Sequence, residues 1–180
     1  MNSETQLFGG NIVDVLSPKV EDVDIYQIAH ALAYQCRFNG NTRKFYSVAQ
    51  HSLLVSCFLP NELALHGLLH DAHEAIIGDI STPMKKSIDE VVGIRNSVNT
   101  IADKWDIVIF DKFGLSIPTE EEHKLIKEAD LRALETEVSY LMGSCKFWTS
   151  SKMNYFRCLK PKKACKEFLK MFFLLYKGEC

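Results

Sequence analysis

The sequence has few of the features that mark secreted, membrane and zinc-finger proteins. Its six cysteines form no C-x-x-C pair, which excludes a zinc knuckle and a thioredoxin-type redox motif. Its longest apolar run, Met171–Tyr176, has six residues, whereas a bilayer span needs roughly 18–20. The first ten residues have neither the basic segment nor the apolar run of a signal peptide. We therefore expect a cytoplasmic protein with reduced thiols and no membrane contact.

A large net charge is also missing. The 180 residues include 21 Lys+Arg and 23 Asp+Glu, so no overall basic field points to nucleic acid. The charges are unevenly placed, because residues 1–143 have 12 basic and 21 acidic side chains, whereas residues 144–180 have 9 and 2. An apolar content of 47% is ordinary for a globular protein. A chain of this length buries about 70% of its unfolded surface, so its core needs no disulfides.

Helical periodicity dominates the chain from Asp22 onward, and no segment shows a convincing strand pattern. Residues 12–16 suit a surface loop or a short edge strand. Capping-box pairs Ser47/Gln50 and Thr119/Glu122 mark two helix starts. The predicted helices cover residues 25–36, 48–58, 62–77, a segment that starts at 82–83 and has no clear end past 93, 120–142, and a last segment after 161. The predicted fold is all-α, with one domain of six or more helices over residues 1–143 and a C-terminal helical extension over 144–180.

Charged groups stand out inside the third predicted helix, where His70 and Asp71 follow an apolar run. Such groups are costly in an apolar helix unless they are paired or bind a cation. The two side chains lie about 100° apart around a helix, so their tips can converge on one ion. An imidazole and a carboxylate suit zinc, manganese, iron or cobalt. His51, near the start of the second helix, and Asp130, within an apolar stripe of the long helix, are candidates for the remaining ligands.

In its order of residues, His51…His70-Asp71…Asp130, the chain resembles the HD-domain metal-dependent phosphohydrolases, whose pattern is H…HD…D on an all-α core. It is most similar to the compact phage and prophage members, which include 5′-deoxynucleotidases and deoxynucleoside-triphosphate (dNTP) triphosphohydrolases, some specific for dATP. The similarity covers roughly residues 8–142. The segments that carry it are Ile28–Leu32, Cys36–Gly40, Phe45–Ser52, His70–Asp79, Ser81–Lys85 and Lys127–Asp130.

The resemblance implies that His51, His70, Asp71 and Asp130 bind one catalytic divalent ion, with a further Mg²⁺ accompanying a triphosphate. It also implies that Glu74 orients or deprotonates the attacking water. Asp79 would lie near the sugar or the metal, although a turn aspartate is an equal alternative. Relatives assemble into dimers or larger rings, so a homo-oligomer is expected.

A phosphate substrate needs cations beside these acids. Lys85 follows a helix N-terminus, which favours anions. Lys127 lies three residues before Asp130, and Arg37 can offer a bidentate fork. Phe38 could stack on a base or pack beside the sugar. Each of the three basic side chains could instead be an ordinary surface charge, and Phe38 could be an ordinary core residue. We select them for substrate binding because of their positions in the sequence near the predicted ligands.

The basic, aromatic segment 144–180 is expected to pack on the domain or to form an oligomer contact, with nucleic-acid binding less favoured. The expected function is hydrolysis of a deoxynucleotide, with a preference for dNTP cleavage into deoxynucleoside and triphosphate. A 5′-deoxynucleotidase would use the same ligands. Two alternatives of other classes are a nucleotide-binding regulator with an inert metal site and a di-iron oxygenase.

Overall fold

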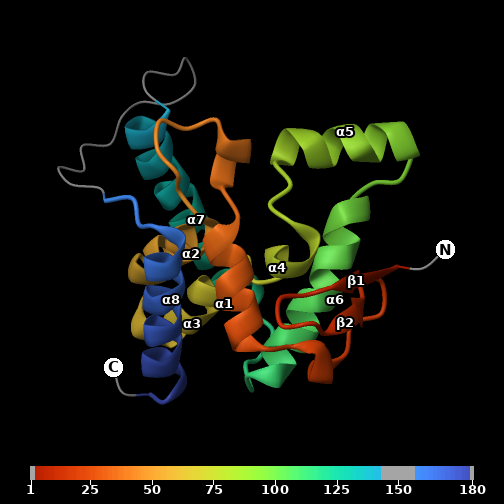
Figure 1. The fold of residues 1–180 in the computed structure, drawn as a ribbon, viewed down its shortest axis with the longest axis horizontal. Coiled ribbons are helices and arrows are strands. Elements are labelled where there is room, and N and C mark those ends of the chain that lie inside the picture. Colours follow the sequence, from red (N-terminus) through yellow and green to blue (C-terminus); the bar gives the residue numbers. More distant parts are fainter. Residues whose placement is uncertain (1–2, 143–156, 179–180) are drawn as a thin grey trace.

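The computed structural model describes residues 3–142 and 157–178, and in these ranges the protein is mostly helical (Figure 1). Among the described residues, seven α-helices have nine residues or more, and an eighth, α4, is a single turn. In chain order they are α1 (Ile25–Tyr34), α2 (Val48–Cys57), α3 (Asn61–Leu69), α4 (Glu74–Ile77), α5 (Thr82–Val92), α6 (Ser97–Lys112), α7 (Glu120–Leu141) and α8 (Pro161–Tyr176).

The all-α prediction is correct only in part, because the N-terminal segment forms a small hairpin. Strands β1 (Glu4–Gln6) and β2 (Ile12–Asp14) pair antiparallel, with Glu4 opposite Asp14. Gly9 and Gly10 have positive φ angles between the strands, and glycine adopts such angles without a steric penalty. Strands of three residues are too short for an alternating pattern to show in the sequence.

The third predicted helix, 62–77, is divided in two. Helix α3 ends at Leu69, and α4 begins at Glu74. Between them the backbone tightens into i→i+3 hydrogen bonds, from Ala72 N to Leu69 O and from Glu74 N to Asp71 O, as in a 3₁₀ turn. The apolar period continues through this turn, so the sequence pattern did not reveal it.

Helix α6 was not predicted as a separate element. Its start carries no capping signature of its own, because its first N–H groups bond to a side chain of the preceding helix. Asp89 of α5 accepts from Asn96 N at 2.7 Å and from Ser97 N at 2.9 Å. Trp105 of α6 is fully buried, and its indole N–H donates to Val15 O at 3.0 Å. Helix α6 therefore joins the N-terminal hairpin to the core.

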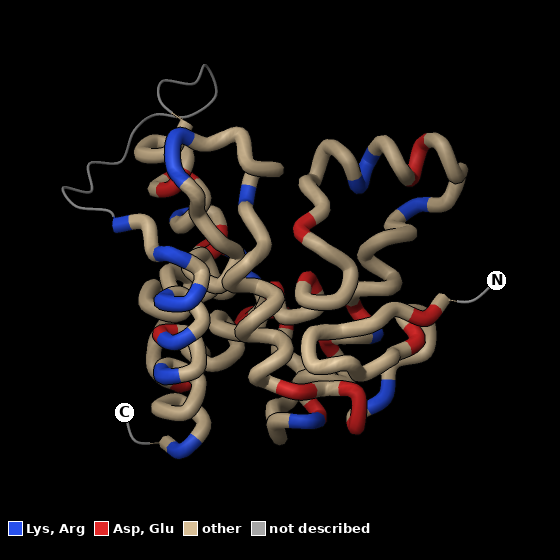
Figure 2. Tube along the Cα trace, viewed as in Figure 1, with Lys and Arg blue, Asp and Glu red and all other residues tan. Residues whose placement is uncertain are grey.

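Helix α8 belongs to the same core as α1, α2 and α3, beside which it lies in Figure 1. Its buried residues are Ala164, Phe168 and Phe172. Its lysines Lys162, Lys163, Lys166 and Lys170 are exposed, and basic positions follow one another along this helix in Figure 2. The predicted boundary at 143/144 lies outside the described residues, as do four aromatic residues of the predicted extension, Phe147, Trp148, Tyr155 and Phe156. Within the described ranges, no helix is both long and apolar enough to span a membrane.

Candidate metal centre

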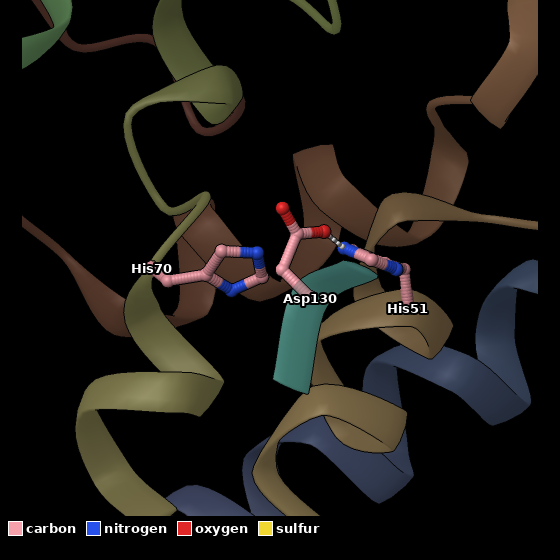
Figure 3. A group of neighbouring side chains, drawn as sticks. All are labelled: His51, His70 and Asp130. Atoms are coloured by element: carbon pink, nitrogen blue, oxygen red, sulfur yellow. Dashed lines mark ion pairs between the residues drawn. The ribbon is translucent and has the colours of Figure 1, made fainter. Parts of the chain in front are cut away.

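Three separate segments bring the four predicted metal ligands together. His51 comes from the first half of α2, where Ser47 caps the helix by accepting from Gln50 N. His70 and Asp71 lie on the turn after α3, and Asp130 lies on α7. In Figure 3 the side chains of His51, His70 and Asp130 point toward one another. Residues that lie up to 79 positions apart in the sequence thus meet at one point.

The distances within this group are short. His51 Nε2 lies 3.2 Å from Asp130 Oδ1 and 3.5 Å from Asp71 Oδ2. His70 Nε2 lies 3.1 Å from Asp71 Oδ2. The candidate ligand atoms of His51, His70 and Asp130 all lie within 4.8 Å of one another. A single ion placed among them could contact all three.

The two imidazoles are prepared to act as ligands. His70 Nδ1 donates to Gly67 O at 2.8 Å, and His51 Nδ1 lies 2.7 Å from Glu137 Oε1. A ring whose Nδ1 carries the proton has its lone pair on Nε2. Both Nε2 atoms are buried and make no hydrogen bond of good geometry among the described residues. Two orphaned nitrogens beside two carboxylates form a donor set that fits a divalent ion.

Glu137 is the important residue that the sequence analysis missed. It is fully buried on α7, and besides His51 it accepts from Arg37 Nε at 3.1 Å. It lies seven residues after Asp130, so the two carboxylates share one face of the helix. That spacing within an apolar stripe was a signal present in the sequence. Hydrogen bonding of a ligand histidine to a carboxylate is a common way to orient it toward a metal.

The charges of the centre shift one another's proton affinity. Burial alone would lower the pKa of His51, but the Glu137 carboxylate and the contact with Asp130 raise that pKa to about 9. Burial would raise the pKa of Asp71, yet His70, His51 and Arg37 lower it well below its ordinary value. The pKa of Asp130 is likewise held low against burial, chiefly by His51. Asp71 and Asp130 are therefore ionised and attract cations. Without a metal ion His51 holds a second proton at neutral pH, and a bound ion would displace that proton from Nε2.

Arg37 and Phe38 flank the centre on the side of α1. The Arg37 side chain is 11% exposed, and its guanidinium lies between Glu137 and Asp71, with Nη1 3.8 Å from Asp71 Oδ2. Its Cζ lies 5.4 Å from the centre of the Phe38 ring. Phe38 also packs against Tyr46 and Leu141. The ring of Phe38 thus packs between Arg37 and this small apolar cluster.

Two further carboxyl groups adjoin the centre. Glu74 is 6% exposed, and its Oε2 has no hydrogen-bond partner among the described residues. Burial and the neighbouring Asp71 raise the pKa of Glu74 to about 10, and burial raises the pKa of Asp79 as well. Gln35 links the two segments, because its side chain donates to Glu74 O and accepts from Asp79 N. The ligand atoms of Asp71, His73 and Glu74 form a second group that could bind a metal.

The two predicted lysines differ in their contacts. Lys127 Nζ lies 2.6 Å from Asp130 Oδ2 on the same helix face. Lys85, in the first turn of α5, is half-buried and acts on Glu74 and Asp79 through its positive charge. An unpredicted pair joins α6 to the site, since His73 Nδ1 lies 2.9 Å from Asp106 Oδ1.

Fold and site together define a mostly helical protein with buried histidine–aspartate groups that could bind a metal ion. No protein-family model matches the sequence. The chain is 38% identical over 117 residues to the uncharacterized protein YfdR of Escherichia coli strain K12; the match covers 65% of this chain and 60% of YfdR, less than two thirds of that protein. It is 32% identical over 148 residues to the uncharacterized protein RCAP_rcc00048 of Rhodobacter capsulatus, covering 77% of this chain and 72% of that protein. The chain belongs to the same family as the Rhodobacter protein.

Proposed function

We propose that this chain is a divalent-metal-dependent phosphohydrolase of deoxynucleotides, which converts a dNTP into a deoxynucleoside and triphosphate. The observation that carries the proposal is the convergence of two orphaned imidazole nitrogens and two carboxylates from α2, the turn after α3, and α7. The resemblance of His51…His70-Asp71…Asp130 to the HD-domain phosphohydrolases supports the same class.

The four converging residues would bind Zn²⁺, Co²⁺, Mn²⁺ or Fe²⁺, because imidazole and carboxylate ligands suit these ions. Such an ion, when bound, polarises a phosphoryl oxygen and lowers the pKa of a water molecule. Hydrogen bonds from Nδ1 orient the two histidine rings, that of His51 to Glu137 and that of His70 to Gly67 O. Each Nε2 then points toward the aspartates of the centre. A further Mg²⁺ would accompany the triphosphate.

Glu74 is the proposed general base. Its unpartnered Oε2 lies in the buried group with Asp71 and His73, where it can accept a proton from water. Without a metal ion, burial and Asp71 raise the pKa of Glu74 to about 10, so the group holds a proton at neutral pH. A cation at the centre would lower this pKa toward the working pH, where a general base is most effective. Asp79 would orient the sugar or a second cation.

Arg37, Lys85 and Lys127 would counter the negative charge of the phosphates. Arg37 keeps N–H donors beyond the Nε that binds Glu137, and a guanidinium can donate to two phosphate oxygens at once. Phe38 would fix the Arg37 fork by packing against it. Without these cations, the carboxylates of the centre would repel the substrate.

A 5′-deoxynucleotidase that removes one phosphate is the second candidate, and one observation favours it. Arg37 and Lys127 are both engaged with carboxylates of the site, which leaves Lys85 as the least engaged of the three cations. A short phosphate group needs fewer cations than a triphosphate does. Both candidates use the same metal ligands.

Identification of the products separates the candidates. Purified protein would be incubated with all dNTPs, NTPs and monophosphates in Mn²⁺, Co²⁺ or Zn²⁺, and the products resolved by chromatography. We expect deoxynucleoside and intact triphosphate from a dNTP. If the protein releases orthophosphate from a dNMP but no triphosphate from any dNTP, the function is that of a 5′-deoxynucleotidase and our preferred proposal is wrong. Nucleotide-induced thermal stabilisation without turnover in any metal would replace both by a regulatory protein.

A further inference from the structure

A cavity of about 230 Å³, here called the hairpin cavity, lies between the N-terminal hairpin and helices α1, α4 and α6 (Figure 1). None of the four candidate metal ligands lines it. Its floor is apolar and includes the buried Ile28, Trp105 and Ile109. Sites for drug-sized ligands measure roughly 300–1,000 Å³. The hairpin cavity therefore suits a molecule of one or two fused rings better than it suits a whole nucleotide.

Three side chains that line the hairpin cavity offer hydrogen-bond acceptors. Gln27 Oε1 is buried and has no hydrogen-bond partner among the described residues. Asp22 Oδ2 accepts from Lys19 N, and Asp24 Oδ1 accepts from Tyr26 N, which leaves the second oxygen of each carboxylate available to a ligand. A buried acceptor without a partner costs free energy, and a donor group of a ligand would remove that cost.

Charge and aromatic side chains restrict the ligand further. The described residues that line the cavity include two aspartates but no lysine, arginine or histidine, so an anion is disfavoured. Two aromatic rings also line it. The Trp105 N–H donates to Val15 O, and the Phe8 ring stacks on that of His30 with centroids 3.5 Å apart. Both rings are held in place by these contacts, and aromatic rings pack well against a further ring.

We propose that the hairpin cavity binds a small aromatic heterocycle with an exocyclic amino group, of the aminopurine or aminopyrimidine type, at a site separate from the metal centre. The ring packs against Trp105 and the apolar floor, and the amino group donates to Gln27 Oε1. Ala75 and Ile76, which follow Glu74 on α4, form one wall of the cavity. The site needs neither a metal ion nor a phosphate, so it is independent of the proposed function.

Adenine and hypoxanthine test the need for an amino donor, because they share one ring system and differ in whether one carbon carries an amino group or an oxygen. Their dissociation constants would be measured by calorimetric titration, and the melting temperature of each protein without ligand by circular dichroism. Gln27→Leu removes the acceptor with little change in volume, and Ala31→Leu fills part of the cavity, which Ala31 lines. Asp71→Ala is the control, because it changes the metal centre and not the cavity.

We expect adenine to bind the wild type and Asp71→Ala equally, and hypoxanthine to bind the wild type at least about tenfold more weakly, a difference of about 1.4 kcal/mol. Gln27→Leu and Ala31→Leu should each weaken adenine binding by at least the same factor. The melting temperature of Gln27→Leu should not fall, because this change removes a buried acceptor that has no partner.

The site would be overturned by a wild type that does not bind adenine or binds hypoxanthine equally well. Unchanged adenine binding in Gln27→Leu, or an equal loss in Asp71→Ala, would overturn it too. If Gln27→Leu lowers the melting temperature, Ala31→Leu decides, and unchanged adenine binding in that variant overturns the site. Adenine binding that depends on Gln27, in a protein that hydrolyses no nucleotide, would disprove the proposed function and leave this site intact.

Discussion

The two sides of the candidate site are attached to the fold in different ways. His51 and Glu137 are fully buried on α2 and α7, and hydrogen bonds join them to each other and to Arg37. Lys85 lies on α5, a helix that has no buried residue. The candidate metal ligands thus lie in the protein interior, whereas Lys85, which we propose to face the phosphates, lies on a surface helix.

This difference separates two kinds of effect. A change among the buried ligands alters the geometry and charge in which a metal ion would bind. A change on α5 should alter substrate binding and turnover but not the fold of the interior, because α5 has no buried residue. The comparison predicts that metal affinity and substrate handling respond to different substitutions.

Asp71→Ala should have the largest effect. Asp71 Oδ2 lies within 4 Å of side-chain nitrogens of His70, His51 and Arg37, so its removal takes away the carboxylate that these three groups share. We expect bound metal and nucleotide hydrolysis to fall to background. Elemental analysis and a product assay measure the two, and Asp111→Ala, an exposed residue of α6, is the control.

The helical core of the Asp71→Ala variant should persist, because its apolar contacts do not include Asp71. Far-ultraviolet circular dichroism should give a native helix content and cooperative unfolding. Full turnover by this variant would show that the metal ligands are wrongly assigned.

Glu137→Gln should have the next largest effect. The amide keeps the shape of the side chain but loses the charge shared by His51 and Arg37. Loss of such a supporting carboxylate typically costs about 10- to 100-fold in metal affinity, and we expect a fall in that range by calorimetric titration with Zn²⁺ or Co²⁺. Glu135→Gln, an exposed change two residues earlier, should leave the affinity unchanged. Equal affinities in both variants would remove Glu137 from the centre.

The sequence predicted the candidate metal ligands better than it predicted Glu137, the residue that orients His51. His70, Asp71 and Asp130 stood out because charged residues in apolar helices need partners. The resemblance to the HD-domain phosphohydrolases then joined them with His51 as one set. Glu137 has the same chemistry, but its partners His51 and Arg37 lie 86 and 100 residues away. Such pairings depend on how α2 and α7 pack, which residue spacing along one helix does not reveal.

The prediction of helices shows the same limit. The Ser47 and Thr119 caps are local, and the structure confirms both helix starts. The start of α6 could not be predicted, because its donors are bonded by Asp89 of another helix. The end of α3 was missed because the turn after it continues the apolar pattern. Local signals were sufficient only where the stabilising partner is also local.

Lys85→Ala tests the surface side of the comparison. Lys85 is half-buried near Glu74 and Asp79, whereas the adjacent Lys86 is exposed. Removal of a cation that faces a phosphate should lower kcat/KM for nucleotides by about tenfold, the equivalent of one charge-assisted hydrogen bond. Metal affinity and melting temperature should not change. Lys86→Ala is the control, and an equal loss in both variants would indicate a diffuse effect of charge.

Asp89→Ala should give the smallest effect, because it changes only how α5 is attached. The Asp89 carboxylate accepts from Asn96 N, Ser97 N and Ser97 Oγ, and alanine leaves the two N–H groups at the start of α6 without this acceptor. Amide hydrogens of α5 and the first turn of α6 should exchange faster, while metal affinity remains that of the wild type. Since Lys85 is carried by the same helix, KM for nucleotides should rise by less than it does in Lys85→Ala.

Glu90→Ala, an exposed change at the next residue, should alter none of these quantities. A fall in metal affinity in Asp89→Ala would mean that α5 also supports the ligands, and the two sides of the site would then be one unit.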